Sequence, residues 1–293
     1  MMVHHNLGPL NPCRVVLLGG SGFIGHRLSS VLSNDGTDVL CLGSKDLDLS
    51  APSAVARLER LLCSTDCVVF LSAITPDKGR DTDVLIKNLL MIKHLCKALK
   101  NKPVNHLVYF SSDAVYGQSQ SFVSEDSPVA PEDLYGIMHL SREIMLLELK
   151  AIPFIILRVT MVYGSEDTHA SYGPNRFFKT AEQNGVINLF GCGEEMRDHI
   201  NVNDVANITK LCINMRSEGV LNLATGNSNS FKSVAKVVAD QFSNKVEIKE
   251  NPRTTPITHR HYDITNLLRA FPLLSFTNFE DGASSYRSNR VVT

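Results

Sequence analysis

The sequence predicts an α/β fold in which a doubly wound parallel sheet carries helices on both faces. Three observations point to this class. Short apolar runs alternate with longer segments of helical period, and a glycine-rich turn separates the first run from the first helical segment. This is the rhythm of strand–helix–strand units, whose helices cover both faces of a sheet. The rhythm breaks after Gly164, which indicates a second, smaller lobe.

The alternation defines the expected elements of the sheet. Strands are expected at residues 14–18, 39–42, 68–72, 106–111 and 154–159, and helices at residues 24–34, 52–62, 82–100 and 131–150. Residues 205–215 and 220–223 are expected to return to the sheet as a helix and a strand. Within residues 131–150, Leu140, Ile144 and Leu147 recur at helical spacing, which predicts a buried stripe.

Composition and charge exclude several classes of function. The formal net charge is -1, so the chain has no general attraction for nucleic acid or anionic membranes. Cys63 and Cys67 lack the CxxC spacing of zinc sites, and no metal site is expected. No apolar run approaches the roughly 20 residues of a membrane span. We therefore expect a cytoplasmic protein, with residues 1–12 as a flexible tail.

A glycine-rich turn follows the first strand and opens the first helix. Its residues are Gly19, Gly20, Ser21, Gly22, Phe23, Ile24 and Gly25. Glycines allow a tight turn and a close approach of backbone N–H groups to a pyrophosphate, and the helix N-terminus adds partial positive charge. A glycine-rich loop without a ligand is the alternative, but the flanking strand and helix favour dinucleotide binding and a Rossmann-like sheet.

These patterns suggest a division of the chain. Residues 13–164 are expected to form the dinucleotide-binding domain, with residues 199–225 returning to it. Residues 165–198 and 226–293 are expected to form the C-terminal lobe, which would bind the substrate. That lobe includes helices expected at 177–184 and 231–242 and a strand at 186–190.

The end of the second strand bears on the choice of dinucleotide. An NAD-specific fold usually offers a carboxylate there to the adenosine ribose, but the strand runs into Ser44 and Lys45. Asp46 and Asp48 come later in the turn. Ser44 and Lys45 could instead hold a 2′-phosphate, so NADP is favoured over NAD. A solvated turn lysine is the alternative interpretation.

Two further segments carry hydroxyl groups that can move protons. The fourth strand runs into Ser112 and Asp113 within HLVYFSSDAVYG, and Tyr135 follows in DLYGIMH. These segments resemble the SSxxVYG and YxxxK signatures of the extended short-chain dehydrogenase/reductase family, in its nucleotide-sugar epimerase and dehydratase group. Ala73, Asn88, the stretch from Arg158 to Gly164 and the stretch from Arg197 to Ala206 extend the resemblance over nearly the whole chain.

The resemblance implies roles for these residues. Ser112 would hydrogen-bond the reacting sugar oxygen, Tyr135 would transfer its proton, and Ala73 would lie against the cofactor. The same roles are chemically reasonable, since an alcohol that loses hydride needs a base within reach and a donor for the developing oxyanion. We therefore expect an NAD(P)-dependent enzyme that acts on a nucleotide-linked sugar.

The departure from the signature is His139, which stands where the family has lysine. Helical spacing places it on the face of Tyr135, where it could contact both the phenol and the cofactor ribose. With an ordinary pKa of about 6.5, imidazole is mostly neutral at pH 7. We expect slow activity or activity favoured at lower pH, with a limb of the pH profile near the imidazole pKa. A weakened enzyme that only binds cofactor and sugar nucleotide is the alternative.

The type of reaction stays open between epimerisation and reduction. Resembling dehydratases carry a pair of acids after the serine or threonine, and here Asp113 is followed by Ala114. Elimination is therefore less favoured, although Asp113 could act as a single catalytic acid. The second candidate is an NADPH-dependent reductase of a keto-sugar nucleotide.

The C-terminal lobe supplies candidates for holding the substrate. The resemblance implies that the diphosphate and nucleoside lie near Asn175, Arg176 and Arg197, with Arg260 in a comparable C-terminal stretch. Guanidinium groups suit phosphate geometry. His169 could relay a proton from the loop after Gly164, although a surface histidine is the alternative. By resemblance, a homodimer would form through the helices at 82–100 and 131–150.

Overall fold

The computed structural model describes residues 2–167 and 173–288, and the chain divides into two compact units. Unit 1 comprises Met1–Gly117, Ser127–Val159 and Val205–Asn222, and unit 2 comprises Gln118–Asp126, Thr160–Asp204 and Leu223–Thr293. These boundaries differ from the expected ones. The first long stretch of unit 2 begins at Thr160 rather than after Gly164, and residues 118–126 also belong to unit 2.

Unit 1 is built on a seven-stranded sheet with the order β1-β11-β7-β5-β4-β2-β3. Its strands are β1 (Val3–His4), β2 (Arg14–Leu18), β3 (Asp38–Leu42), β4 (Asp66–Phe70), β5 (His106–Ser112), β7 (Phe154–Val159) and β11 (Ser217–Leu223). The five strands from β3 to β7 in this order pair in parallel. All residues of β4 are buried, as expected for a strand covered on both faces.

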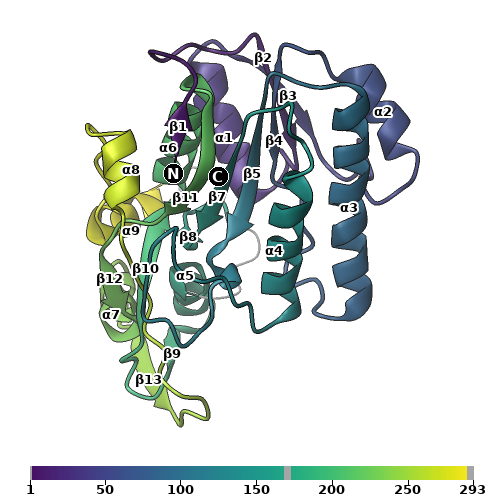
Figure 1. Ribbon diagram of the computed structural model, residues 1–293. Coiled ribbons are helices and arrows are strands. Elements are labelled where there is room, and N and C mark those ends of the chain that lie inside the picture. Colours follow the sequence, from purple (N-terminus) through teal and green to yellow (C-terminus); the bar gives the residue numbers. More distant parts are fainter. Residues whose placement is uncertain (1, 168–172, 289–293) are drawn as a thin grey trace. The chain divides into compact units, whose positions relative to one another are not determined.

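The helices of unit 1 cover both faces of this sheet. They are α1 (Phe23–Asn34), α2 (Ala54–Leu61), α3 (Thr82–Asn101), η1 (Asp113–Val115), α4 (Leu134–Leu146) and α6 (Val202–Asn214), of which the first residues belong to unit 2. Figure 1 shows α2, α3 and α4 on one face and α1 and α6 on the other, which confirms the doubly wound α/β fold. Helix α4 begins later than expected because the Asp133 side chain caps it by accepting from the Gly136 N–H at 2.7 Å.

The buried stripe expected on α4 is wrong for two of its three residues. The side chains of Ile144 and Leu147 are 58% and 61% exposed. The face of α4 that is buried carries Gly136, Met138, His139, Arg142, Glu143 and Leu146. Apolar periodicity identified a real stripe, but the sheet lies against the opposite, more polar face of the helix.

The N-terminal residues also differ from the expected flexible tail. Strand β1 pairs antiparallel with β11, so the sheet extends by one edge strand. The backbone N–H groups of Asn6 and Leu10 then donate to the carbonyl oxygens of Met215 and Asn214 at 3.1 and 3.0 Å. Backbone hydrogen bonds, which side-chain patterns do not reveal, hold this segment.

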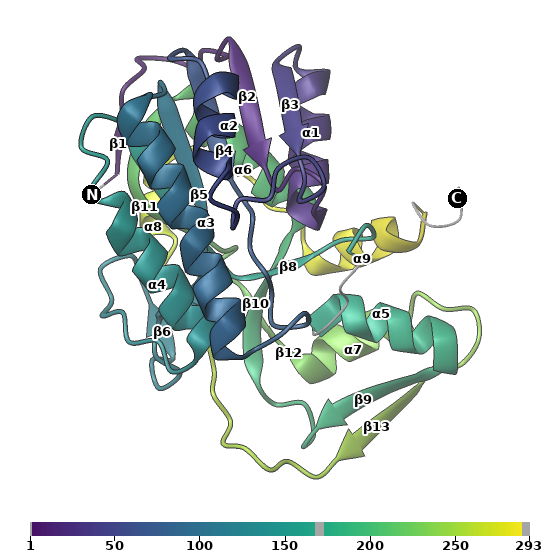
Figure 2. The ribbon, with the colours of Figure 1, turned by 90° about the vertical axis from the view of Figure 1, so that its right-hand side faces the viewer.

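Unit 2 contains three small sheets and four helices within the described residues. The strands pair as β12-β10-β8, β13-β9 and β14-β6, and Figure 2 shows β9 and β13 side by side. Their bounds are β6 (Phe122–Val123), β8 (Met161–Tyr163), β9 (Val186–Phe190), β10 (Met196–Asn201), β12 (Ser228–Ser230), β13 (Glu247–Asn251) and β14 (His261–Tyr262). The helices are α5 (Gly173–Asn184), α7 (Phe231–Ala239), α8 (Thr265–Ala270) and α9 (Phe279–Ser288).

Two searches of the described residues bear on function. None of their helices is both long enough and apolar enough to cross a membrane. Within residues 2–167 and 173–288, no group of three or more histidine, cysteine, aspartate or glutamate side chains could hold a metal ion.

Candidate functional site

The glycine-rich turn after β2 has no room for side chains at several of its positions. Gly19 has a φ of 97°, and a Cβ atom there would lie 2.8 Å from the backbone nitrogen of Ser72. A Cβ atom at Gly25 would lie 2.5 Å from the carbonyl oxygen of Gly19. Helix α1 then begins without a side-chain cap and without an acid in its first turn. The turn therefore presents an uncapped helix N-terminus, which favours a bound anion.

The position of this turn in the sheet is the usual one for a ligand. Strand β2 lies between β3 and β4, so the chain reverses its direction of winding there. In open α/β sheets, ligands bind at the carboxyl ends of the strands beside such a reversal. The close approach of Gly19, after β2, to Ser72, after β4, marks this point.

An acidic side chain, Asp46, lies at the end of β3, although the sequence analysis set it aside as too late in the turn. The Asp46 Oδ2 atom accepts from the Gly43 N–H at 2.9 Å, because the turn over residues 44–46 folds back on the strand. A Cβ atom at Gly43 would meet the Ser21 hydroxyl at 2.6 Å, so this strand end adjoins the glycine-rich turn. Ser44 and Lys45 are exposed. The sequence signal for this carboxylate was Asp46 itself, but its position along the chain lies beyond the end of the strand, where the carboxylate is usually found.

The segments that carry Ser112 and Tyr135 pack against each other. Ser112 ends β5, and its hydroxyl accepts from the Ala114 N–H at 3.2 Å and donates to Asp113 Oδ1 at 3.3 Å. Tyr135 lies in the first turn of α4. A Cβ atom at the next residue, Gly136, would lie 2.2 Å from the carbonyl oxygen of Ala114. The first turn of α4 therefore meets η1 backbone to backbone.

His139 is buried, with 3% of its surface exposed. Its Nδ1 atom lies 2.8 Å from the Tyr109 hydroxyl, and its ring meets the Tyr135 ring edge to face with centroids 4.6 Å apart. Burial and the charge of Arg142 lower the pKa of His139 well below its ordinary value. The ring is therefore neutral at pH 7. Burial opposes the titration near pH 6.5 that was expected from the sequence, and the shape of the pH profile stays a prediction.

Arg142 is a further buried charge that the sequence analysis missed. Its guanidinium donates to the carbonyl oxygens of Ser72 and Asn88 at 2.8 and 2.7 Å and lies over the Phe70 ring, 4.9 Å from the centroid. Its spacing was a usable signal, since Arg142 lies three residues after His139 on the same helix face.

The loop that contains Ala73 is held by the same group of residues. Asn88 accepts from the Ile74 N–H at 2.9 Å and donates to the Ile74 carbonyl oxygen at 3.1 Å. Together with the bond from Arg142 to Ser72, this fixes the backbone on both sides of Ala73. The loop after β4 is thus a rigid neighbour of the glycine-rich turn.

A buried ion pair lies next to these residues in unit 1. Arg158 donates to both carboxylate oxygens of Glu143, at 3.1 and 2.8 Å, and Ser111 donates to Glu143 at 2.5 Å. Arg158 also donates to the Tyr116 hydroxyl at 3.0 Å, which donates to Asn222 at 2.8 Å. This network joins α4 to β5, β7 and β11, so it holds the helix that carries Tyr135.

The candidates in unit 2 differ in their surroundings. Asn175 is buried, and its Oδ1 atom accepts from the Gly164 N–H at 3.1 Å. Its Nδ2 atom donates to the Val162 carbonyl oxygen at 3.2 Å and to Asp167 at 2.7 Å, so the amide stabilises the local fold. Arg176 is exposed and Arg260 is buried. His169 lies outside the described residues.

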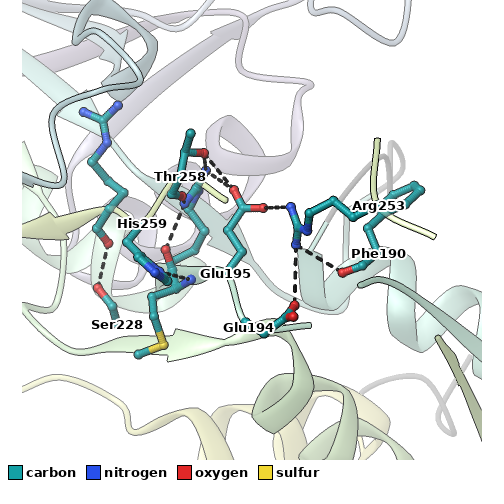
Figure 3. Close-up of polar contacts among 10 residues, drawn as sticks. Phe190, Glu194, Glu195, Ser228, Arg253, Thr258 and His259 are labelled. Carbon is teal, nitrogen blue, oxygen red and sulfur yellow. Dashed lines mark hydrogen bonds and ion pairs between the residues drawn. The ribbon is translucent and has the colours of Figure 1, made fainter. Parts of the chain in front are cut away.

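Arg197 belongs to a network of ion pairs and hydrogen bonds in unit 2. It pairs with Glu195 and donates to the Thr258 hydroxyl at 2.9 Å. Figure 3 shows that Arg253 is directed at Glu195 and at the carbonyl oxygen of Phe190, at distances of 2.9 and 3.1 Å. Glu195 therefore balances two guanidinium groups.

Comparison with known proteins relates this arrangement to one family. Residues 15–224 match the sequence profile described as NAD dependent epimerase/dehydratase family. The chain belongs to this family. It is 25% identical over 321 residues to ADP-L-glycero-D-manno-heptose-6-epimerase of Alkalilimnicola ehrlichii, and the match covers 93% of this chain and 96% of the relative.

Solved structures of other proteins share the fold of this chain. MoeE5 in complex with UDP-glucuronic acid and NAD has a TM-score of 0.84 at 23% identity, covering 96% of this chain and 100% of that one. The Thermus thermophilus UDP-glucose 4-epimerase in complex with NAD has a TM-score of 0.80 at 22% identity, covering 94% of this chain and 99% of that one.

The residues of unit 1 fit the NAD that the family description names. The glycine-rich turn packs so tightly that a Cβ atom at Gly19 or Gly25 would meet backbone atoms, and the helix that follows the turn begins without a side-chain cap. The Nε2 atom of His139 is buried and has no hydrogen-bond partner among the described residues. Both features suit an epimerase/dehydratase family member with a dinucleotide bound at the carboxyl ends of β2 and β4.

Proposed function

We propose that this chain is an NAD-dependent epimerase that acts on a sugar linked to a nucleoside diphosphate. Membership of the NAD dependent epimerase/dehydratase family supports the cofactor and the class of enzyme. The observation that carries the proposal is the packing of the first turn of α4 onto η1 at Gly136 and Ala114, because it brings together the segments of Tyr135 and Ser112.

In this proposal, Tyr135 and Ser112 handle the proton and the oxygen of the reacting alcohol. Tyr135 accepts the hydroxyl proton and later returns it, while the Ser112 hydroxyl donates to the same oxygen as its negative charge develops. Bound NAD accepts and returns hydride. Tyr135 lies in the first turn of α4, where the partial positive charge of the helix N-terminus favours its phenolate form.

Arg142 is the nearby fixed charge in this arrangement. Burial lowers the pKa of Arg142, and its interactions with Tyr109 and Tyr135 act in the opposite direction. The interaction is mutual, so the guanidinium favours the phenolate of Tyr135. His139 remains neutral and contributes no charge.

Epimerisation is the reaction that the residues support best. Asp113 stands alone after Ser112, without the second acid that a dehydratase would use, and its carboxylate accepts from the Ser112 hydroxyl at 3.3 Å. The Alkalilimnicola relative and the Thermus structure are both named as epimerases. Their names also suggest an ADP- or UDP-linked sugar as the class of substrate.

We propose NAD rather than NADP as the cofactor. The carboxylate of Asp46 at the end of β3 can accept from an adenosine ribose hydroxyl, whereas it would repel a 2′-phosphate. This replaces the preference for NADP that Ser44 and Lys45 suggested. MoeE5 and the Thermus epimerase are both described in complex with NAD.

We also propose a homodimer through α3 and α4. The exposed fractions are 54% for Ile86 on α3, 39% and 58% for Ile137 and Ile144 on α4, and 61% for Leu147 at the C-cap of α4. Figure 2 shows these two helices side by side, and four such helices from two copies would bury the apolar residues. A cytoplasmic location stays a prediction of the sequence.

The test is turnover of a panel of ADP- and UDP-linked sugars by the purified protein with NAD. We expect epimerised product, retention of deuterium placed at the reacting carbon, and no net change in the nicotinamide absorbance. Tyr135→Phe and Ser112→Ala should each lower turnover at least about 100-fold, and the matched variant Tyr286→Phe should not.

Other outcomes would overturn the proposal in distinct ways. Stoichiometric consumption of NADPH with a keto-sugar nucleotide would identify a reductase. NAD binding without turnover of any sugar would identify a binding protein that has lost catalysis. Tighter binding of NADP than NAD would overturn the cofactor assignment alone.

A further inference from the structure

Helix α4 contacts the chain on both sides of Ser112. Its residue Glu143 accepts a hydrogen bond from the Ser111 hydroxyl at 2.5 Å, and Ser111 directly precedes Ser112 on β5. In the first turn of the same helix, a Cβ atom at Gly136 would lie 2.2 Å from the carbonyl oxygen of Ala114, which follows Ser112 by two residues. The two contacts therefore bracket the serine.

These contacts lie at two points along one helix. Tyr135 is next to Gly136, and Glu143 follows Tyr135 by eight residues. That spacing corresponds to about 12 Å along the helix axis. A helix behaves as a rigid element over this length. Contacts at both points therefore fix the shift of α4 along its axis, so Tyr135 and the segment of Ser112 cannot move independently.

The carboxylate of Glu143 has little freedom to turn. Arg158 on β7 donates to both of its oxygens, at 3.1 and 2.8 Å, and such a bidentate pair fixes the direction of a carboxylate as well as its distance. Burial opposes the charge of Arg158, but its interactions with Glu143 and Tyr116 raise its pKa above the ordinary value, so the guanidinium stays charged. Glu143 therefore presents one defined oxygen to Ser111.

Arg158 is held in turn by the residue that follows η1. The Tyr116 hydroxyl accepts from Arg158 at 3.0 Å and donates to Asn222 on β11 at 2.8 Å. The Tyr116 N–H donates to the Asp113 carbonyl oxygen at 3.0 Å. The network thus leaves the chain just before Ser112 and returns to it just after η1, which forms a closed ring around the serine.

We propose that Glu143 sets the position of Ser112 relative to Tyr135, with Ser111 and Arg158 as its partners. The three are positioning residues, because they act through Ser112 and Tyr135. The proposal rests on the proposed function, in which those two side chains handle the oxygen and the proton of one alcohol. Proton transfer requires both groups within hydrogen-bond reach of the same oxygen.

A role in stability alone is a weaker account of the pair formed by Glu143 and Arg158. Taking two charges out of water costs free energy, and apolar residues of similar volume often stabilise a core as well or better. An apolar pair cannot supply a fixed direction, whereas a bidentate ion pair with a third hydrogen bond can. The arrangement therefore suits the alignment of two reacting groups.

The test uses Ser111→Ala, which removes one hydrogen bond and leaves Glu143 paired with Arg158. The matched control is Thr209→Val on α6, which removes another buried hydroxyl, one that donates to the Val205 carbonyl oxygen at 2.7 Å. Ser111→Ala should lower kcat about tenfold, as expected for a displacement of less than about 1 Å. KM should stay unchanged, because substrate binding is retained. Thr209→Val should leave both constants unchanged.

Backbone hydrogen exchange of the full chain gives a second measurement that does not depend on turnover. The Ala114 N–H donates to the Ser112 hydroxyl at 3.2 Å, and the Tyr116 N–H donates to Asp113. Both amides should exchange about tenfold faster in Ser111→Ala than in the native protein, because the segment opens locally more often. In Thr209→Val they should exchange at the native rate.

A second variant guards against misfolding of the first. Tyr116→Phe keeps the ring but removes the hydroxyl that accepts from Arg158. It should lower kcat and speed exchange at Ala114 in the same direction as Ser111→Ala. If Ser111→Ala does not fold, Tyr116→Phe decides between positioning and stability.

The outcomes separate this proposal from the proposed function. A native kcat, or native exchange at Ala114 and Tyr116, would overturn positioning, and a fall in the free energy of unfolding alone would show that the network serves stability. If the native protein turns over no sugar nucleotide, the proposed function fails. The exchange rates then decide whether Glu143 holds the segment of Ser112.

Discussion

A Cβ atom at Gly136 would lie 2.2 Å from the carbonyl oxygen of Ala114, so helix α4 rests backbone to backbone on the turn that follows Ser112. The atom that an added Cβ would meet belongs to the backbone, so it cannot move aside as the end of a flexible side chain could. The contact therefore couples the position of Tyr135, one residue before Gly136, to the segment of Ser112. Small displacements of a proton-transfer group by about 1 Å can cost about 100-fold in rate.

The substitution Gly136→Ala should accordingly lower turnover by about 100-fold and destabilise the fold by about 1–3 kcal/mol. Steady-state kinetics and urea unfolding would measure the two effects. Gly8→Ala is the matched control, because a Cβ atom at Gly8 meets nothing within 4 Å. Native turnover in Gly136→Ala would show that the contact does not position Tyr135.

Two glycines of the dinucleotide turn should differ in their tolerance of a methyl group. A Cβ atom would lie 2.5 Å from the Gly19 carbonyl oxygen at Gly25, but 3.3 Å from it at Gly22. Gly25→Ala should weaken NAD binding, measured by calorimetry, by at least about tenfold, or about 1.4 kcal/mol. Gly22→Ala should weaken NAD binding less, and the reverse order would contradict the tight packing described for the turn.

The pH profile of turnover should lack a limb near 6.5, because burial and Arg142 keep the pKa of His139 well below that range. His139→Lys adds a cation beside Tyr135, which favours the phenolate of Tyr135. The fall in turnover at acidic pH that comes from protonation of Tyr135 should then move to lower pH by about one unit. Ser141→Lys adds the same charge on another face of α4 and should leave the limb in place. A limb near 6.5 that disappears in His139→Lys would show that His139 titrates there.

Acid should destabilise the protein through His106. Burial lowers the pKa of His106 from 6.5 to about 4 in the folded state. The unfolded chain therefore binds more protons between these values, and stability present above pH 6.5 is lost as the pH falls toward 4. The loss amounts to about 3 kcal/mol at 1.36 kcal/mol per pKa unit.

The variant His106→Gln isolates this effect from other groups. Burial also lowers the pKa of His199, to about 3, whereas burial raises that of Asp198, to about 6, which acts in the opposite direction. The free energy of unfolding of His106→Gln, followed by urea titration, should fall less than that of the native protein between pH 7 and pH 4.5. His26→Gln, at an exposed position, is the control. Equal falls in all three proteins would contradict the assignment.

The proposed dimer predicts the effect of charge on α4. Ile144→Glu would place a carboxylate in the apolar contact between two copies, and light scattering should then find a monomer. Leu273→Glu changes a residue that is 99% exposed outside α3 and α4, and it should leave the dimer intact. A native protein that is monomeric at micromolar concentration would rule out the dimer.

The local pattern of apolar residues was sufficient to predict much of the fold. The apolar runs that became β2 and β7 begin and end where the sequence predicted, because strands buried on both faces need continuous apolar residues. Strand β9 also has its predicted bounds. The same pattern was not sufficient for α4. Periodicity cannot say whether an apolar stripe faces the sheet or the outside of the monomer, which is why Ile144 and Leu147 were wrongly expected to be buried.

Short-range spacing along the chain was enough to predict the parallel strands, the glycine turn and the order of Ser112, Tyr135 and His139. The environment of these side chains became visible only in the folded chain. Folding turned Asp46 back to Gly43, placed Arg142 and Tyr109 around His139, and buried that ring so that it stays neutral. A pKa depends on the desolvation and charges that distant segments bring together, and these arise only when the chain is folded.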